Sequence, residues 1–153
     1  MTPYDRLARL YLFRDTRPAD LTALTDRCRF VWYRVGTCVF REGSPADNAL
    51  LVVSGRLVVG FPDGIQELVI GDVRPGEVTG ERALVAPGGP RGADLYAQED
   101  TLCLVLSPAV MTELARNPAV QAIERHLLGT MARRVLQNNR SHRRIVATER
   151  RSA

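Results

Sequence analysis

The chain has 153 residues, 45% of them hydrophobic and 25% charged, which is the composition of an ordinary globular domain with a sizeable core. No apolar run approaches the roughly 18 residues that a membrane-spanning helix needs. The first ten residues lack the basic and then apolar layout of a signal peptide. We therefore expect one cytoplasmic domain without membrane contact.

The net charge of +4 is unevenly distributed, and all 21 basic residues are arginine. Residues 133–153 contain seven arginines and one acid, so the rest of the chain is slightly acidic. This basic segment is either the solvated flank of a helix or a surface that binds nucleic acid or another acidic partner. Cys28, Cys38 and Cys103 form no CxxC pair and are odd in number, so we expect buried, reduced thiols.

Two short helices are predicted at the N-terminus. The first spans residues 4–14. Its apolar face consists of Leu7, Leu10, Tyr11 and Leu12. The second begins at Pro18, a favourable residue for a first turn, and carries Leu21 and Leu24 three residues apart.

Between residues 29 and 106 the helical period disappears and short β-branched runs follow one another. These runs are residues 30–35, 37–40, 49–54, 56–61, 66–73 and 101–106. Glycines suited to tight turns separate them at Gly36, Gly43, Gly55, Gly64, Gly71 and Gly76. Many short strands predict a mainly β fold, a jelly-roll or small barrel with flanking helices. Trp32, the only tryptophan, is expected in its core.

The first strand pair has an interpretable order of turn and strand residues. Gly43 lets the chain turn, residues 49–53 form a buried strand, and Ser54–Gly55 is expected to be a hairpin turn. Asp47 and Asn48 have turn-forming side chains and are interpreted as loop residues. We assign these residues structural roles and no contact with a ligand.

Residues 75–97 contain the candidate ligand-binding residues of the chain. A Gly-Glu pair ending at Glu81 precedes a short helical run, residues 82–85, and a Pro/Gly loop leads to Arg91. Free backbone N–H groups at a glycine-preceded helix start attract a phosphate, and an arginine fork can hold one bidentately. The Glu81 carboxylate repels phosphate but accepts hydrogen bonds from sugar hydroxyls. The segment therefore predicts a nucleotide whose phosphate and ribose lie close together.

This segment resembles the phosphate-binding cassette of the cyclic nucleotide-binding domain family, whose pattern is G-E-L-A-L, a short loop and P-R-(A/S/T)-A. The resemblance implies that Glu81 accepts from the ribose 2′-hydroxyl and that Arg91 pairs with the cyclic phosphate. Backbone N–H groups around Arg82, Ala83 and Gly92 would complete the cradle. The implied site in this segment is Gly80, Glu81, Arg82, Ala83, Arg91, Gly92 and Ala93. Residues 42–55 also resemble the E-G-(x)6-(L/Y)-x-(I/V)-x-x-G strand pair of the family.

Three residues depart from the family pattern. Arg82 replaces an aliphatic residue, and Gly92 stands where alanine, serine or threonine is common. Threonine at that position is associated with cyclic GMP, so its absence favours cyclic AMP. Asp94 stands where threonine or serine is frequent, and its charge lowers ligand affinity if it points inward and changes nothing if it points outward. A degenerate domain that binds nothing and serves only in assembly is therefore an alternative.

The C-terminal part is predicted to be helical. Ser107-Pro108 opens a hinge helix that completes a domain of residues 1–117, and Asn117-Pro118 begins a long helix in residues 118–153. Its seam is Leu128, Met131, Val135, Asn138, His142 and Ile145. Spacings that alternate between three and four residues predict a parallel homodimer through residues 118–147. A monomer whose stripe packs on its own β-roll is the alternative.

Residues 131–135, M-A-R-R-V, are similar to the dimerisation helix of the catabolite-activator branch of the family. The resemblance implies that Asn138 and Asn139 reach the nucleotide, one from each protomer. That branch carries a helix-turn-helix domain after this helix. The sequence ends at Ala153, at a native C-terminus or at a truncation, and leaves no room for one. We therefore expect an effector protein as a further partner and no DNA binding through such a domain.

Enzymatic function is not indicated. A metal-dependent jelly-roll enzyme needs His/Glu clusters on its strands, and the two histidines, His126 and His142, both lie in the long helix. No G-x-S-x-G or P-loop pattern is present. We expect no catalytic residue, no metal and no cofactor. The leading interpretation is a non-catalytic cyclic nucleotide sensor that signals through its C-terminal helix.

Overall fold

The computed structural model describes residues 1–63 and 66–133, which form two four-stranded antiparallel sheets with the orders β1-β8-β3-β6 and β2-β7-β4-β5. The strands are β1 (Arg29–Tyr33), β2 (Cys38–Phe40), β3 (Ala49–Ser54), β4 (Leu57–Asp63), β5 (Gln66–Val73), β6 (Val78–Thr79), β7 (Asp94–Ala97) and β8 (Thr101–Leu106). The predicted mainly β jelly-roll is confirmed. The sequence did not indicate β6 and β7, because strands of two and four residues are too short to show a period.

The two sheets enclose one core, and the helices cover a second. In β3, Leu51 and Val53 contribute to the core under the helices, whereas Leu50 and Val52 face the other sheet. Successive side chains of a strand point to opposite faces, so a strand that is buried on both faces has a continuous apolar sequence. Every residue of β8 is buried for the same reason.

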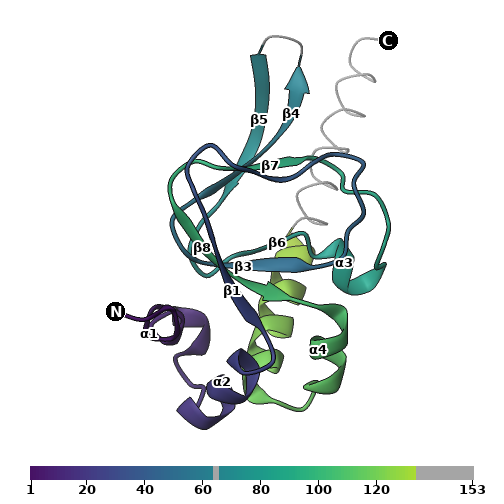
Figure 1. Ribbon diagram of the computed structural model, residues 1–153. Coiled ribbons are helices and arrows are strands. Elements are labelled where there is room, and N and C mark those ends of the chain that lie inside the picture. The colour runs from purple at the N-terminus through teal and green to yellow at the C-terminus, as the bar shows by residue number, and fades with distance from the viewer. Residues whose placement is uncertain (64–65, 134–153) are drawn as a thin grey trace, which may run out of the picture.

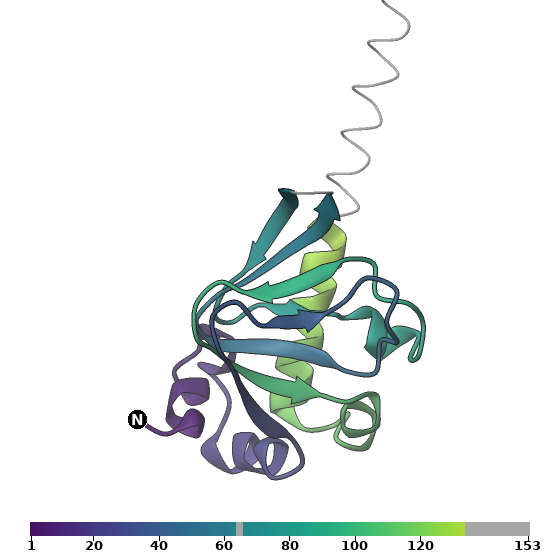
Figure 2. The ribbon, with the colours of Figure 1, turned by 45° about the horizontal axis from the view of Figure 1, so that its top comes forward.

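The helices gather on one side of the first sheet, as Figure 1 shows, and Figure 2 shows the last helix running behind the strands. They are α1 (Pro3–Ala8), the 3-10 helix η1 (Tyr11–Phe13), α2 (Pro18–Thr25), α3 (Arg82–Val85), α4 (Pro108–Glu113) and the helix of residues 118–133. Leu21 and Leu24 of α2 are buried as predicted. In the last helix Ala119, Val120 and Ile123 are fully buried, so its first turns belong to the core.

The prediction of one helix over residues 4–14 is wrong. A capping box between Thr2 and Asp5 starts α1, but the chain is extended at Leu10 and continues as η1. This change of direction buries Phe13 and leaves Tyr11 77% exposed. Burial of the larger apolar side chain thus overrides the helical period.

Two further expectations need correction. Trp32 is 54% exposed, because β1 is an edge strand and the Arg6 guanidinium, 5.9 Å from the ring centroid, covers it only in part. Ser54–Gly55 is no hairpin turn, since β3 pairs with β8 and β6 while β4 belongs to the other sheet. Gly55, with φ +90°, instead redirects the chain between sheets where a Cβ would lie 2.5 Å from the Asp100 carbonyl oxygen.

The three cysteines are free thiols, as predicted. Cys103 is fully buried, whereas Cys28 and Cys38 are only partly buried. The prediction of buried thiols is therefore confirmed in full only for Cys103. Burial raises the pKa of Cys103 to about 12 and that of Cys28 to about 11. Both thiols are therefore protonated at neutral pH.

Candidate functional site

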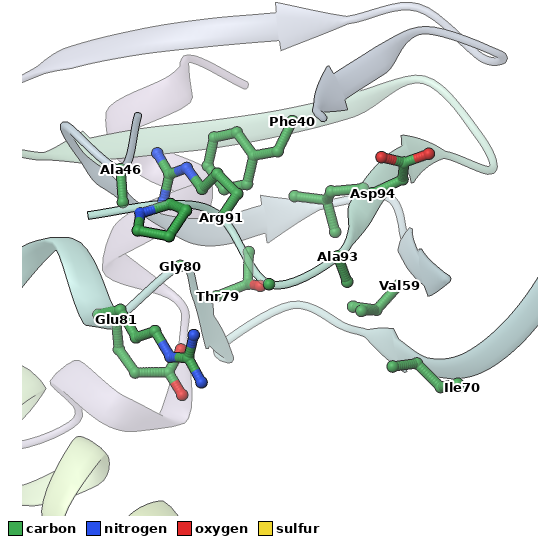
Figure 3. Close-up of a pocket in the computed structure, with 14 residues that line it drawn as sticks. Phe40, Ala46, Val59, Ile70, Thr79, Gly80, Glu81, Arg91, Ala93 and Asp94 are labelled. Carbon is green, nitrogen blue, oxygen red and sulfur yellow. The ribbon is translucent and has the colours of Figure 1, made fainter. Parts of the chain in front are cut away.

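A cavity of about 340 Å³ lies against the second sheet, between α3 and the segment that leads into β7. Figure 3 shows residues from distant parts of the chain meeting there. These parts are the end of β2, the loop at Ala46, the middle of β4, the middle of β5, residues 79–82 and residues 90–95. The cavity therefore brings most of the predicted cassette together.

Arg91 forms the buried part of this cavity. Its side chain is 8% exposed, its guanidinium carbon lies 3.6 Å from the centroid of the Phe40 ring, and Nη2 donates to the Asn48 carbonyl at 2.8 Å. Nε and Nη1 are buried without a hydrogen-bond partner. Burial lowers the pKa of Arg91, and the charge of Asp47 opposes this shift. An unpaired buried donor costs about 1–3 kcal/mol, so a cation with two such donors is poised to receive an anion.

Gly80 makes room for this guanidinium. Its φ of +73° is in the left-handed region, and a Cβ there would lie 2.8 Å from Nη1 of Arg91 and 2.9 Å from Cε2 of Phe40. Only glycine avoids both the backbone strain and the overlap. Glycine at position 80 is thus required by the close approach of Arg91 as well as by the turn into α3.

Backbone hydrogen bonds position Arg91 by joining two distant segments. The Arg91 amide donates to the Ser44 carbonyl, and the Arg91 carbonyl accepts from the Gly43 amide, both at 2.8 Å. The Ala46 amide likewise donates to the Gly89 carbonyl at 2.8 Å. The two family-like patterns, residues 42–55 and 75–97, therefore meet in space.

The other predicted cassette residues lie around this cation. Glu81, half-buried, and Ala93 line the cavity, as does the exposed Arg82. Gly92 lines it too, next to the Arg82 guanidinium. Ala83 is fully buried behind the cavity, and its amide donates to the Gly80 carbonyl at 3.1 Å.

Asp94 directs its charge to the protein and away from Arg91. Its carboxylate is 5% exposed and accepts from the Glu42 amide at 2.7 Å and from the Tyr96 hydroxyl at 3.1 Å. In Figure 3 it lies to the right of Arg91, and its carboxylate points away from the Arg91 guanidinium. Asp94 also lines the cavity, so its charge stays near the candidate site, although both carboxylate oxygens are hydrogen-bonded to the protein.

Several contributors were not identified from the sequence. Phe40 stacks on Arg91, the Asn48 carbonyl accepts from it, and Val59, Ile70 and Thr79 line the cavity. No local pattern distinguishes a phenylalanine or a loop carbonyl with this role, because the role arises only when distant segments meet. Asn138 and Asn139, predicted to reach the ligand, lie outside the described residues, as does most of the basic segment.

A second hollow, of about 320 Å³, continues the cavity toward the last helix. It shares Val59, Ile70 and Thr79 with the first, and His126 and Thr130 of the helix form its far side. Burial lowers the pKa of His126, the charge of Arg133 lowers it further, and Glu77 opposes both. The helix thus lines a space adjoining the candidate site.

Among residues 1–63 and 66–133, no group of three or more His, Cys, Asp or Glu side chains is placed to hold a metal ion. No helix in the same ranges is long and apolar enough to cross a bilayer.

Comparison with known proteins identifies the fold and the family. Over 145 residues the chain is 28% identical to a CRP-like cAMP-activated global transcriptional regulator of Mycobacterium tuberculosis, covering 94% of this chain and 63% of that protein. It is 32% identical over 96 residues to the acetyltransferase Pat of Mycolicibacterium smegmatis, covering 63% of this chain and 28% of that enzyme. The crystal structure of the Thermus thermophilus catabolite activator protein superposes with a TM-score of 0.68 at 28% identity, covering 84% of this chain and 59% of that one.

The chain thus spans less than two thirds of the length of these relatives. Residues 30–117, which include all of both sheets except Arg29 and the whole cavity, match the family described as cyclic nucleotide-binding domain. The chain belongs to the cyclic nucleotide-binding domain family.

Proposed function

We propose that the chain is a non-catalytic sensor that binds a cyclic mononucleotide, cyclic AMP in preference to cyclic GMP. The observation that carries the proposal is the environment of Arg91. This cation is only 8% exposed and has two unpaired donors at a cavity that Glu81 also lines. The phosphate of the ligand supplies the missing acceptors, and the Glu81 carboxylate accepts from a ribose hydroxyl. The apolar side chains of Val59 and Ile70 line the same cavity and suit the flat face of a purine.

Two observations support cyclic AMP over cyclic GMP. Position 92 is glycine, so the chain lacks the threonine hydroxyl that the family resemblance associates with cyclic GMP. The mycobacterial relative, 28% identical over 145 residues, is described as cAMP-activated.

Signalling through the C-terminal helix is the second part of the proposal. His126 and Thr130 line the hollow that adjoins the cavity, so a ligand that fills the cavity lies next to the helix. The helix also borders an apolar groove of about 490 Å³ with α3 and α4, which Leu84 of α3 and Met131 of the helix both line. A shift of α3 when the ligand binds would therefore change the surface that the helix presents to an effector protein.

Homodimerisation through residues 118–147 completes the proposal. Leu128 is 66% exposed and Val85 of α3 is 74% exposed, and both line this apolar groove. A second copy of the helix buries them. Analytical ultracentrifugation tests this part: Leu128→Glu shifts a dimer toward monomer, and a wild-type monomer at all concentrations contradicts it.

Isothermal titration with cyclic AMP and with cyclic GMP tests the ligand assignment. The protein must be folded and freed of copurified nucleotide by unfolding and refolding. We expect micromolar or tighter binding of cyclic AMP, and a loss of about tenfold to a hundredfold in Arg91→Ala, since a hydrogen bond to a charged group contributes about 1.5–3 kcal/mol.

The matched control is Arg116→Ala, which removes an exposed arginine that does not line the cavity. Unchanged affinity in Arg91→Ala contradicts the assignment of the site. Absence of heat with both nucleotides indicates the degenerate scaffold instead.

A further inference from the structure

Two arginines enter the cavity from opposite segments, and each lies against the glycine of the other segment. Arg91 follows the Pro/Gly loop, and its Nη1 lies 2.8 Å from where a Cβ of Gly80 would stand. Arg82 belongs to α3, and its Nη1 and Cζ lie 3.4 Å and 3.9 Å from where a Cβ of Gly92 would stand. The two contacts are reciprocal: Arg91 lies against Gly80, which precedes α3, and Arg82 of α3 lies against Gly92, which follows Arg91.

Gly92 and Gly80 differ in backbone conformation. Gly80 has a positive φ that favours glycine, whereas the φ of Gly92 lies outside the left-handed region. Its φ therefore does not require glycine. An added Cβ at position 92 would stand 3.4 Å from Nη1 of Arg82, which is ordinary van der Waals contact with the end of a flexible side chain. The two departures from the family pattern in the cassette, Arg82 and Gly92, thus lie next to each other at the cavity.

We propose that the Arg82 side chain is a second anion-binding group of the site, which contacts the ligand phosphate from the rim while Arg91 contacts it from below. The proposal rests on the proposed function, because it assigns a further contact to the same ligand. Arg91 is buried and Arg82 is exposed, and both line one cavity of about 340 Å³. A cyclic phosphodiester has two free oxygens, and each can accept from a different guanidinium.

Two arginines at one phosphate affect how the affinity depends on charge and salt. Two cations at one phosphate make affinity depend on ligand charge and on ionic strength more than a single arginine does, and the exposed cation is the one that salt screens. The Arg82 guanidinium lies next to position 92, so a substitution there should act on the ligand through Arg82.

Titration calorimetry with cyclic AMP on a double-mutant cycle tests this inference. The variants are Arg82→Gln, Gly92→Ala, the double variant and the charge control Arg116→Gln. We expect Arg82→Gln to weaken binding about threefold to tenfold, less than Arg91→Ala because water screens an exposed guanidinium. Arg116→Gln should bind as the wild type does. The affinity of Arg82→Gln should also fall less steeply between 50 mM and 300 mM salt.

Gly92→Ala supplies the sharper measurement. The added methyl group stands in van der Waals contact with the Arg82 guanidinium and restricts the positions open to it. We therefore expect a small loss of affinity in the wild-type background and none in Arg82→Gln, so that the two changes are not additive. Thermal melts confirm that each variant is folded, which we expect because both positions are exposed.

The possible outcomes separate this inference from the proposed function. If the wild type binds cyclic AMP and Arg91→Ala loses it, but Arg82→Gln binds equally or more tightly, only the role of Arg82 is overturned. Equal effects of Gly92→Ala in both backgrounds also overturn it. If the folded wild type binds neither cyclic AMP nor cyclic GMP, the proposed function fails and the role of Arg82 falls with it.

Discussion

The two sheets of this protein differ in what covers them. The sheet β1-β8-β3-β6 lies under the helices, and its central strands β3 and β8 are buried on both faces. The sheet β2-β7-β4-β5 has an open face, where Val69 and Ile70 are 59% and 55% exposed, and the cavity lies against this sheet. The apolar core under the helices and the candidate binding site thus lie on different sheets.

The division has an energetic reason. The proposed anion site has buried donors without partners, and the unpaired Nε and Nη1 of Arg91 lower the stability of the fold. The helix-covered layer contributes the apolar burial that offsets this cost. Changes in the first layer should therefore alter folding, and changes in the second should alter binding.

The largest expected effect is on the covered layer. Leu104, fully buried in β8, contacts the core under the helices, and Leu104→Ala should lower the free energy of unfolding by about 2–5 kcal/mol. Urea denaturation measures this change, with the exposed Val69→Ala of the open layer as its matched control. If Leu104→Ala lowers the free energy of unfolding no more than Val69→Ala does, the helix-covered sheet is not the main source of stability.

Gly80→Ala should have the next largest effect and should change both properties. The positive φ and the overlap with Arg91 and Phe40 together cost about 1–3 kcal/mol, and the displaced guanidinium no longer reaches the phosphate. Gly88→Ala is the control, since Gly88 has φ +83° with no atom near the added Cβ. Equal losses of stability in the two variants would show that only the backbone strain matters.

Arg91→Met should separate binding from stability most clearly. Methionine keeps apolar contact with Phe40 and removes two unpaired donors, so the free energy of unfolding should stay within about 1 kcal/mol of wild type or rise. Cyclic nucleotide binding should be lost. Chemical denaturation and titration calorimetry on the same preparation test this, and a loss of several kcal/mol would assign Arg91 to the scaffold.

The smallest expected effect concerns pH and the last helix. The folded-state pKa of His126 is lowered by burial and by Arg133, with Glu77 in opposition, so the unfolded chain takes up a proton first as pH falls below about 6.5. The histidine therefore reduces stability from about pH 6.5 down to its lower folded pKa, and contributes no pH dependence above that range. His126→Gln should show a smaller decrease in Tm between pH 7.5 and pH 5.0. An unchanged decrease would contradict this.

Local pattern and long-range contact differ in how far the sequence predicts them. The β-branched runs predicted six strands near their observed positions, because a strand that is buried on both faces needs a continuous apolar sequence. The turn at Ser54–Gly55 was assigned to the wrong connection, because glycine signals a change of direction and does not name the partner strand. Trp32 was misplaced because its exposure depends on whether a neighbouring helix covers the edge of the sheet.

The sequence by itself determined the jelly-roll class and the cassette, since both depend on short patterns of apolar, glycine and charged residues. Only the tertiary structure decided which groups surround the charged side chains of the cassette. It placed Phe40 and the Asn48 carbonyl against Arg91, turned Asp94 toward the Glu42 amide, and set Arg82 over Gly92. These contacts join segments that are distant in the chain, and their geometry exists only after the two sheets and the loops between them have packed together.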